Sequence, residues 1–290
     1  MGLHRHLRHV LQSHPHGKVW WQSLLACSLL ACAAFSQGLH AAEQPLVALS
    51  SVDPSIRQDM RYASKDNFTG RRVPGYEAAE CWLRPAAARA LAKVQADLVA
   101  EHPDLSLKVF DCYRPRRSVQ AFVAWAGAAE DGATRHYYPN VSRGALLGQG
   151  YIGRASNHSK GIAVDLTLVH RKGSASSTAG PGSAERKAEV STSGDCTQTS
   201  DKILDPTSLD MGTSFDCFDR KSHTQVSGLT AEQRSARQLL VRVMQRHGFQ
   251  NYTREWWHFT FGAADDGRSF DVPVRPSPVS VPQLPQSSGK

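Results

Sequence analysis

Two short stretches of the sequence carry the side chains best suited to bind a metal ion. The first contains His158 and Asp165, and Gly161 between them permits a backbone geometry that a side chain would hinder. On the strand expected there, Asp165 shares a face with the small Ala163, so its carboxylate can face a cleft. The second stretch supplies His258. Two imidazoles and a carboxylate are a usual ligand set for catalytic zinc, which keeps one position open for water.

The second stretch, Glu255-Trp256-Trp257-His258, also supplies a free carboxylate. Metal-assisted hydrolysis needs a base beside the ion, because the proton of the attacking water must be removed and passed to the leaving amine. We expect Glu255 to do this. Positions 255 and 258 of a regular strand point to opposite faces. Glu255 is therefore expected just before the strand, or at a bulge.

The first 42 residues look like a targeting segment. They carry Arg5, Arg8 and Lys18 and no acidic residue, followed by an apolar run over 19–35. This run is shorter and more interrupted than a typical membrane span, and it fits a secretory signal cleaved near Ala41-Ala42. Two alternatives stay open: a membrane anchor, and a lipoprotein, because Leu-Leu-Ala-Cys occurs twice. The sequence thus predicts an exported protein, located in the periplasm.

Composition and charge narrow the class of partner. The chain has 290 residues, 40% of them hydrophobic and 21% charged, which is enough for one large domain or two small ones. The formal net charge is +8, of which residues 1–42 contribute +3, so the remainder carries about +5 without any long Lys/Arg block. This mild excess suits an anionic neighbourhood such as cell wall and argues against a nucleic-acid partner.

Four cysteines follow the leader: Cys81, Cys112, Cys196 and Cys217. An even set in an exported protein indicates disulfides, and the favoured pairs are Cys196–Cys217, which are close in sequence, and Cys81–Cys112. Buried free thiols are the alternative. None of the four has the spacing of a zinc knuckle, so we do not interpret them as metal ligands.

Hydrophobic periodicity predicts helices and strands around these motifs. Strands are expected at Ile56–Ala63, Leu105–Phe110, up to Leu168, and Glu255–Phe261. Helices are expected from Pro85, from Ser118 as the cap, and from the capping box of Thr230 and Gln233 to Gly248.

Two segments have the composition of loosely packed chain. Residues 171–202 are rich in Ser, Gly, Ala and Thr, which predicts a flexible insertion. Residues 273–290 are rich in Pro and Ser, which predicts a disordered tail. The candidate catalytic domain therefore covers 43–272.

Taken in order, the motifs resemble a known family. SxHxxGxAxD followed by ExxWH is similar to the zinc D,D-peptidases, and closest to the D-Ala-D-Ala dipeptidase branch that includes the vancomycin-resistance dipeptidases. Further matching blocks span roughly residues 55–275: Arg61-Tyr62-Ala63, Asp66–Gly70, Asp111–Arg116, Tyr138-Pro139-Asn140, Met211-Gly212 and Phe215-Asp216.

The resemblance implies a fold and a cofactor. The implied fold is α+β, a small, mostly antiparallel sheet flanked by helices, as in the Hedgehog/D,D-peptidase group. The implied cofactor is one Zn²⁺ per chain, bound by His158, Asp165 and His258, with Glu255 as the catalytic acid/base.

The resemblance also implies substrate roles. Arg114 would stabilise the oxyanion, although a structural salt bridge is the alternative. Asp216 would meet the free ammonium of the substrate, and Ser156, with Tyr62 or Tyr76, would line the small pocket. An acid at the amine end explains a preference for dipeptides over blocked or longer chains, because a buried charge must be paired.

The expected function is zinc-dependent hydrolysis of D-alanyl-D-alanine to two D-alanines in cell-wall peptide turnover. One alternative is a D,D-carboxypeptidase that trims peptidoglycan stem peptides, and another is a zinc-bearing binding module, which would lack Glu255 or Arg114. The expected partner is a small D,D-dipeptide, with no membrane span in the mature chain unless it is lipidated, and no sequence signature defines the oligomeric state. The leader, the insertion and the cysteines depart from the family pattern, and the insertion can reshape the rim of the pocket.

Overall fold

The computed structural model describes residues 45–171, 194–198, 201 and 205–277. The predicted leader, most of the predicted insertion and the last part of the tail therefore lie outside the described residues. Among the described residues, no helix has both the length and the apolar character needed to cross a membrane.

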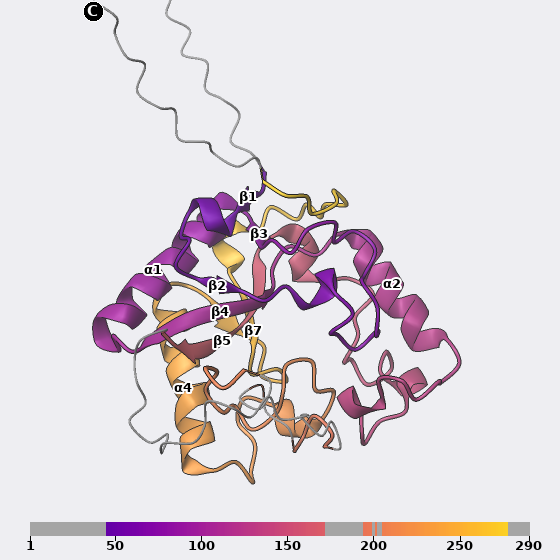
Figure 1. Cartoon of the computed structure of the whole chain (residues 1–290). Helices are drawn as coiled ribbons and strands as arrows, with labels where there is room; N and C mark the ends of the chain where they lie inside the picture. The colour runs from indigo at the N-terminus through magenta and orange to yellow at the C-terminus, as the bar shows by residue number, and fades with distance from the viewer. Residues whose placement is uncertain (1–44, 172–193, 199–200, 202–204, 278–290) are drawn as a thin grey trace, which may run out of the picture. The chain divides into compact units, whose positions relative to one another are not determined.

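A five-stranded sheet forms the centre of the described region (Figure 1). Its strand order is β2-β4-β5-β7-β6, and three of its four pairings are antiparallel, with β2 and β4 parallel. The strands are β2 (Arg57–Gln58), β4 (Leu105–Asp111), β5 (Ala163–His170), β7 (His258–Thr260) and β6 (Gln250–Asn251). β1 (Val47–Ala48) and β3 (Trp82–Leu83) form a separate antiparallel pair. The predicted α+β class and mostly antiparallel sheet are confirmed.

The register of the central strands places three functional-type side chains in one row. Asp111 at the end of β4 is paired with Asp165 on β5, and Asp165 is paired with His258 on β7. Directly paired residues on neighbouring strands project to the same face. The row therefore brings together groups that are far apart in the sequence.

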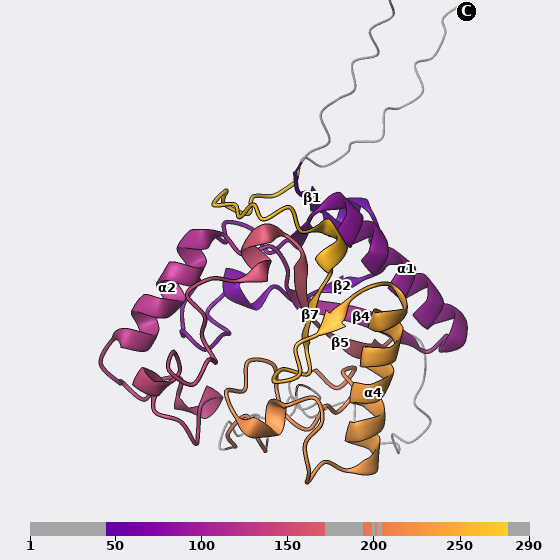
Figure 2. The ribbon, with the colours of Figure 1, turned by 180° about the vertical axis from the view of Figure 1, so that it is seen from behind.

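Helices α1 (Pro85–Glu101) and α4 (Ala231–Arg246) pack against the sheet and against each other (Figures 1 and 2). The apolar residues of α1 recur at helical spacing and are buried, as are those of α4. Both reciprocal hydrogen bonds of the predicted capping box at Thr230 and Gln233 are present.

Helix α2 (Arg116–Gly127) lies apart from these two helices (Figure 2). Its buried Phe122 and Trp125 pack on the ring of Phe68, with centroid separations of 4.8 and 5.0 Å. This aromatic cluster is part of the hydrophobic core, and Phe122 also faces the pocket described below.

The predicted strand at Ile56–Ala63 is largely wrong. Only Arg57 and Gln58 pair with β4, and Arg61–Ala63 form a short 3-10 helix. The alternating pattern arises because Met60 and Tyr62 are both buried within the turn. Arg61 is also buried, against the carboxylate of Asp59, so it does not lie on a solvent face.

Two predicted boundaries also change. Helix α2 begins at Arg116, and Ser118 lies within its first turn, where the hydroxyl donates to the carbonyl of Pro74 rather than capping the helix. The domain also continues past 272, because Val274 is fully buried and its backbone bonds to Gly75 and Glu77. The boundary at 272 was predicted from the Pro and Ser content of the tail, and composition does not show that a single valine in it is buried.

Both predicted disulfides are present. Cys81–Cys112 joins the chain before β3 to the chain after β4, and Cys196–Cys217 joins the far end of the insertion to the segment that follows it, with Cα–Cα separations of 5.2 and 5.3 Å. All four cysteines are buried.

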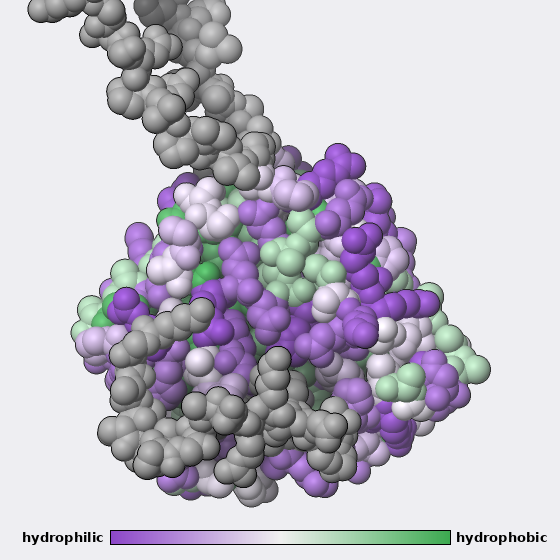
Figure 3. All heavy atoms as spheres, viewed as in Figure 1, coloured by the Kyte–Doolittle hydropathy of each residue, from purple (hydrophilic) through white to green (hydrophobic). Residues whose placement is uncertain are grey.

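The face seen in Figure 3 is mainly hydrophilic, with small hydrophobic patches between polar side chains.

Candidate active site

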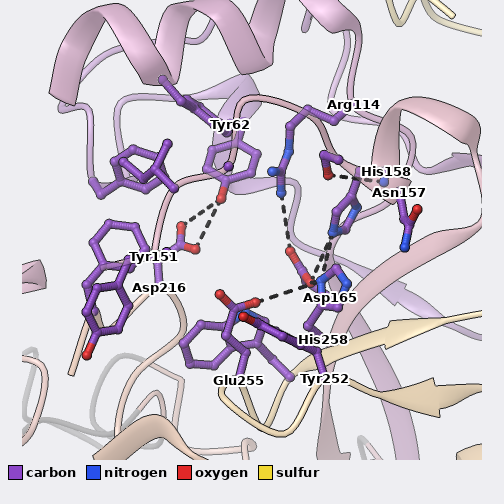
Figure 4. A pocket seen from close by; sticks show the side chains of 18 of the residues that line it. Tyr62, Arg114, Tyr151, Asn157, His158, Asp165, Asp216, Tyr252, Glu255 and His258 are labelled. Atoms are coloured by element: carbon purple, nitrogen blue, oxygen red, sulfur yellow. Dashed lines mark hydrogen bonds and ion pairs between the residues drawn. The ribbon is translucent and has the colours of Figure 1, made fainter. Parts of the chain in front are cut away.

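Three side chains converge on one point above the sheet (Figure 4). His158 comes from the short helix Asn157–Lys160, Asp165 from β5 and His258 from the start of β7. His158 Nε2 lies 3.1 Å from His258 Nδ1, and Asp165 Oδ1 lies 3.3 and 2.9 Å from these two nitrogens. Ligand atoms of a tetrahedral zinc site, with bonds of about 2.0–2.1 Å, lie about 3.3 Å apart. The donor set therefore fits a single metal ion.

The ring of His158 is held in one tautomer. Its Nδ1 lies 2.6 Å from the carbonyl oxygen of Cys112, which can only accept, so Nδ1 carries the proton and Nε2 is free for a metal. The hydroxyl of Ser156 accepts from the backbone of His158 and begins the short helix. Gly161 ends it at φ +70°, where an added Cβ would collide with the side chain of Leu46.

Glu255 lies in the turn before β7, as predicted from the strand period. Its backbone N–H donates to Tyr252, and its carboxylate lies 3.8 Å from His258 Nδ1. Burial, reinforced by the negative charge of Asp165, raises the pKa of Glu255 to about 7 against the opposing effect of His258. A carboxyl that titrates near neutrality can both take up and release a proton, which acid/base catalysis requires.

Arg114 follows the row of strand-end residues and points into the same site. Its guanidinium lies 3.5 Å from Asp165 and contacts Asp111 at 2.7 Å. It also lies over the rings of Tyr62 and Phe122, about 5 Å from each centroid. The salt bridge that we considered as an alternative is therefore present, and Arg114 lines the pocket as well.

Asp111 is a site residue that the sequence analysis did not single out. It is fully buried, and its two oxygens receive the hydroxyl of Tyr76 at 2.6 Å and the guanidinium of Arg114. Its carboxylate also lies 3.4 Å from His158 Nδ1. The signal that could have found it was its place in the Asp111–Arg116 block.

Asp216 lies at the other end of the site and is 4% exposed. Its carboxylate accepts the hydroxyl of Tyr62, with distances of 2.9 and 3.1 Å. Burial, together with the charge of Asp165, raises the pKa of Asp216 well above its usual value. Within the part of the chain that the structure describes, no side-chain cation forms an ion pair with it. A ligand cation in the pocket would supply the missing charge.

The pocket between these two ends has a volume of about 270 Å³. Tyr62 and Ser156 line it as predicted, but Tyr76 does not, because its side chain is buried behind the pocket on Asp111. Six aromatic side chains also line the pocket: Phe68, Phe122, Tyr151, Phe218, Tyr252 and Trp257. Of these, only Phe68 and Trp257 lie in motifs that the sequence analysis named. This volume is just below the about 300–1,000 Å³ of drug-sized ligand sites, so it suits a smaller molecule.

A convergent His–Asp–His group with a glutamate and an arginine beside it is suited to metal-assisted hydrolysis. Comparison with known proteins agrees with this class. The family model described as D-Ala-D-Ala dipeptidase matches residues 42–181 and 186–275. The chain therefore belongs to this family of metallopeptidases.

Individual relatives cover most of the chain. The D-alanyl-D-alanine dipeptidases of Enterococcus faecalis and Streptomyces coelicolor are each 33% identical to it, over 75% and 76% of this chain and 91% and 93% of theirs. The D-alanyl-D-alanine dipeptidase of Escherichia coli is 29% identical over 74% of this chain and 83% of its own length.

Proposed function

We propose that this chain hydrolyses D-alanyl-D-alanine to two molecules of D-alanine. One observation carries the proposal: a small pocket has the His–Asp–His group at one end and the buried carboxylate of Asp216 at the other, and no cation of the described residues forms an ion pair with that carboxylate. A free dipeptide has an ammonium group on one side of its peptide bond and a carboxylate on the other. The family membership and the relatives' names support the same substrate.

The metal is proposed to be one zinc ion per chain, held by His158, Asp165 and His258. Nitrogen and carboxylate donors at tetrahedral spacing favour zinc. When bound, zinc supplies polarisation of the scissile carbonyl and a lowered pKa for a water molecule.

The side chains around the metal ligands divide the remaining work. Glu255 takes a proton from the attacking water and delivers it to the leaving amine, which a carboxyl with a pKa of about 7 can do in both directions. The guanidinium of Arg114 stabilises the negative charge that develops on the carbonyl oxygen. Asp111 holds that guanidinium at 2.7 Å, so little reorganisation accompanies the reaction.

Recognition of the substrate is proposed to depend on its free ammonium. The carboxylate of Asp216 pairs with this ammonium, and Tyr62, which donates to the same carboxylate, fixes its direction. Ser156 lines the pocket beside the metal ligands. An acylated amine would leave Asp216 buried without a partner charge, so blocked and longer peptides should bind poorly.

Release of D-alanine by the purified chain without residues 1–42 tests this function. Free D-Ala-D-Ala and an N-acylated pentapeptide that ends in D-Ala-D-Ala are offered in parallel, each with and without a chelator. We expect chelator-sensitive cleavage of the free dipeptide. Cleavage mainly of the pentapeptide would instead identify a D,D-carboxypeptidase and remove Asp216 from its assigned role.

The setting is proposed to be outside the cytoplasm, in the turnover of cell-wall peptides. The signal-like residues 1–42 and the two disulfides support an oxidising compartment. Fractionation of cells that express the full chain, with sequencing of the mature N-terminus, tests the location. Protein recovered from the cytoplasm with residues 1–42 still attached would contradict export.

A further inference from the structure

We infer that the Cys196–Cys217 disulfide is a positioning device for Asp216, and that it sets how tightly the enzyme binds the substrate ammonium. This inference rests on the amine-binding role proposed above for Asp216. It assigns a function to the far end of the insertion, from which Cys196 and Asp201 come.

The backbone on both sides of Asp216 is fixed by this part of the insertion. The N–H of Ser214 donates to the carbonyl of Cys196 at 3.1 Å, and the N–H of Phe215 donates to the carboxylate of Asp201 at 2.9 Å. The next residue after Asp216 is Cys217, which is bonded to Cys196. Three successive contacts thus bracket the aspartate.

Asp216 needs such support because its own backbone is in an unfavourable region. Its φ is +60°, and it is the one non-glycine residue with a positive φ among those that the structure describes. Non-glycine residues adopt this conformation uncommonly, although aspartate does so more readily than most, and contacts with the surrounding structure help to hold it. Here the conformation turns the carboxylate toward Tyr62 and the pocket.

The residues that hold Asp216 in place also contact the turn that carries Tyr62 and the short 3-10 helix Arg135–Tyr137. Asp201 is 2% exposed and lies 3.6 Å from the guanidinium of Arg61, the residue next to Tyr62. The N–H of Cys196 donates to His136, and the N–H of Phe218 donates to Tyr137. The Arg61–Tyr62 turn therefore contacts Asp201, which helps to hold Asp216, and also contacts the carboxylate of Asp216 itself.

The other disulfide, Cys81–Cys112, lies at the opposite end of the pocket. Its removal is therefore a matched control, because the same kind of bond is lost at a different place. Cys112 carries the carbonyl that holds His158, and it precedes Arg114 by two residues. Loss of Cys81–Cys112 should therefore lower metal affinity and kcat. Loss of Cys196–Cys217 should raise KM, because it disturbs Asp216, which binds the substrate equally in the ground state and in the transition state.

The experiment measures kcat, KM and bound zinc for the mature chain with Cys196→Ser and Cys217→Ser together. We expect KM for D-Ala-D-Ala to rise about tenfold, with kcat changed less than about threefold and one zinc retained. The pair Cys81→Ser with Cys112→Ser should show the other pattern, a lower kcat and weaker zinc binding. If the serine pair at 196 and 217 does not fold, Cys196→Ala with Cys217→Val fills the buried space without the bond.

A double-mutant cycle with Asp216→Asn shows whether the disulfide acts through Asp216. Removal of the bridge should raise KM little further in the Asp216→Asn background, because coupled residues have non-additive effects. An unchanged KM in the bridge variant, or fully additive effects, would overturn the inference while the dipeptidase function stands. A wild-type chain that does not hydrolyse the dipeptide would overturn the proposed function and this inference with it.

Discussion

At the scale of single residues, two acidic side chains of the pocket lie in different environments. Glu255 is 17% exposed and lies beside His258, and its raised pKa suits proton transfer. Asp216 is more deeply buried, lacks a charged protein partner among the described residues and faces the same pocket. The two carboxyl groups are therefore suited to different roles: Glu255 to proton transfer and Asp216 to the binding of a cation.

Replacement of Glu255 tests the first use. We expect Glu255→Ala to retain bound zinc, because the three donor atoms come from other residues, and to lose about 10²–10⁴-fold in kcat, the range usual for a general base. Steady-state kinetics and elemental analysis of the purified variant measure both quantities. Glu255→Gln, which keeps the shape of the side chain, should be equally impaired. Retention of most of the turnover by either variant would show that another group is the base.

At the scale of elements, the site depends on how strand ends and one tight turn are placed. The row formed by β4, β5 and β7 sets Asp111, Asp165 and His258 side by side. The fourth contributor, His158, is not on a strand and reaches the row through the turn that Gly161 ends. The metal site is therefore sensitive to the backbone of that turn.

Substitution at Gly161 tests this sensitivity. Gly161→Ala should destabilise the fold by about 1–3 kcal/mol, because φ is +70° and the added Cβ would collide with the side chain of Leu46 and crowd the backbone of Arg84. It should also weaken zinc binding by moving His158. Gly262→Ala is the matched control, since its added Cβ meets nothing within 4 Å. Urea unfolding of both variants measures the difference, and equal stabilities would refute the role given to Gly161.

The sequence predicted the elements that carry local signals. The capping box of Thr230 and Gln233 and the position of Glu255 before its strand are confirmed, because both depend on residues within a few positions of each other. Tyr76 was placed in the pocket and is instead behind it on Asp111, because sequence spacing does not show which side of a layer a tyrosine occupies. Tyr151, Phe218 and Tyr252 of the pocket wall were missed for a related reason: they come from segments that only the tertiary fold brings together.

At the scale of the whole molecule, distant segments meet at one pocket. The metal end is built by β5, β7 and the turn before β5, whereas the amine end is built by the Arg61–Ala63 turn and the segment after the insertion. One disulfide is attached to each end. Metal binding should accordingly stabilise the native state, because the ligands are assembled only when these segments are folded together.

Thermal unfolding with and without zinc tests this coupling. A ligand that binds only the native state stabilises it by about 2.7 kcal/mol at a free concentration a hundredfold above Kd, so the melting temperature of the apo chain should rise when zinc is added. Asp165→Ala should lose this response, since it removes one of the three donors. Glu255→Ala should keep it. A zinc response that survives in Asp165→Ala would place the metal elsewhere.

In the proposed complex, the substrate lies between the metal ligands and Asp216. The most direct test compares kcat/KM for D-Ala-D-Ala and for N-acetyl-D-Ala-D-Ala, with the zinc-loaded wild type and with Asp216→Asn. We predict that the wild type prefers the free dipeptide by at least about a hundredfold, because acetylation leaves a buried carboxylate without its partner, and that Asp216→Asn loses most of this preference. A preference that is absent from the wild type, or unchanged in Asp216→Asn, would show that Asp216 does not bind the ammonium of the substrate.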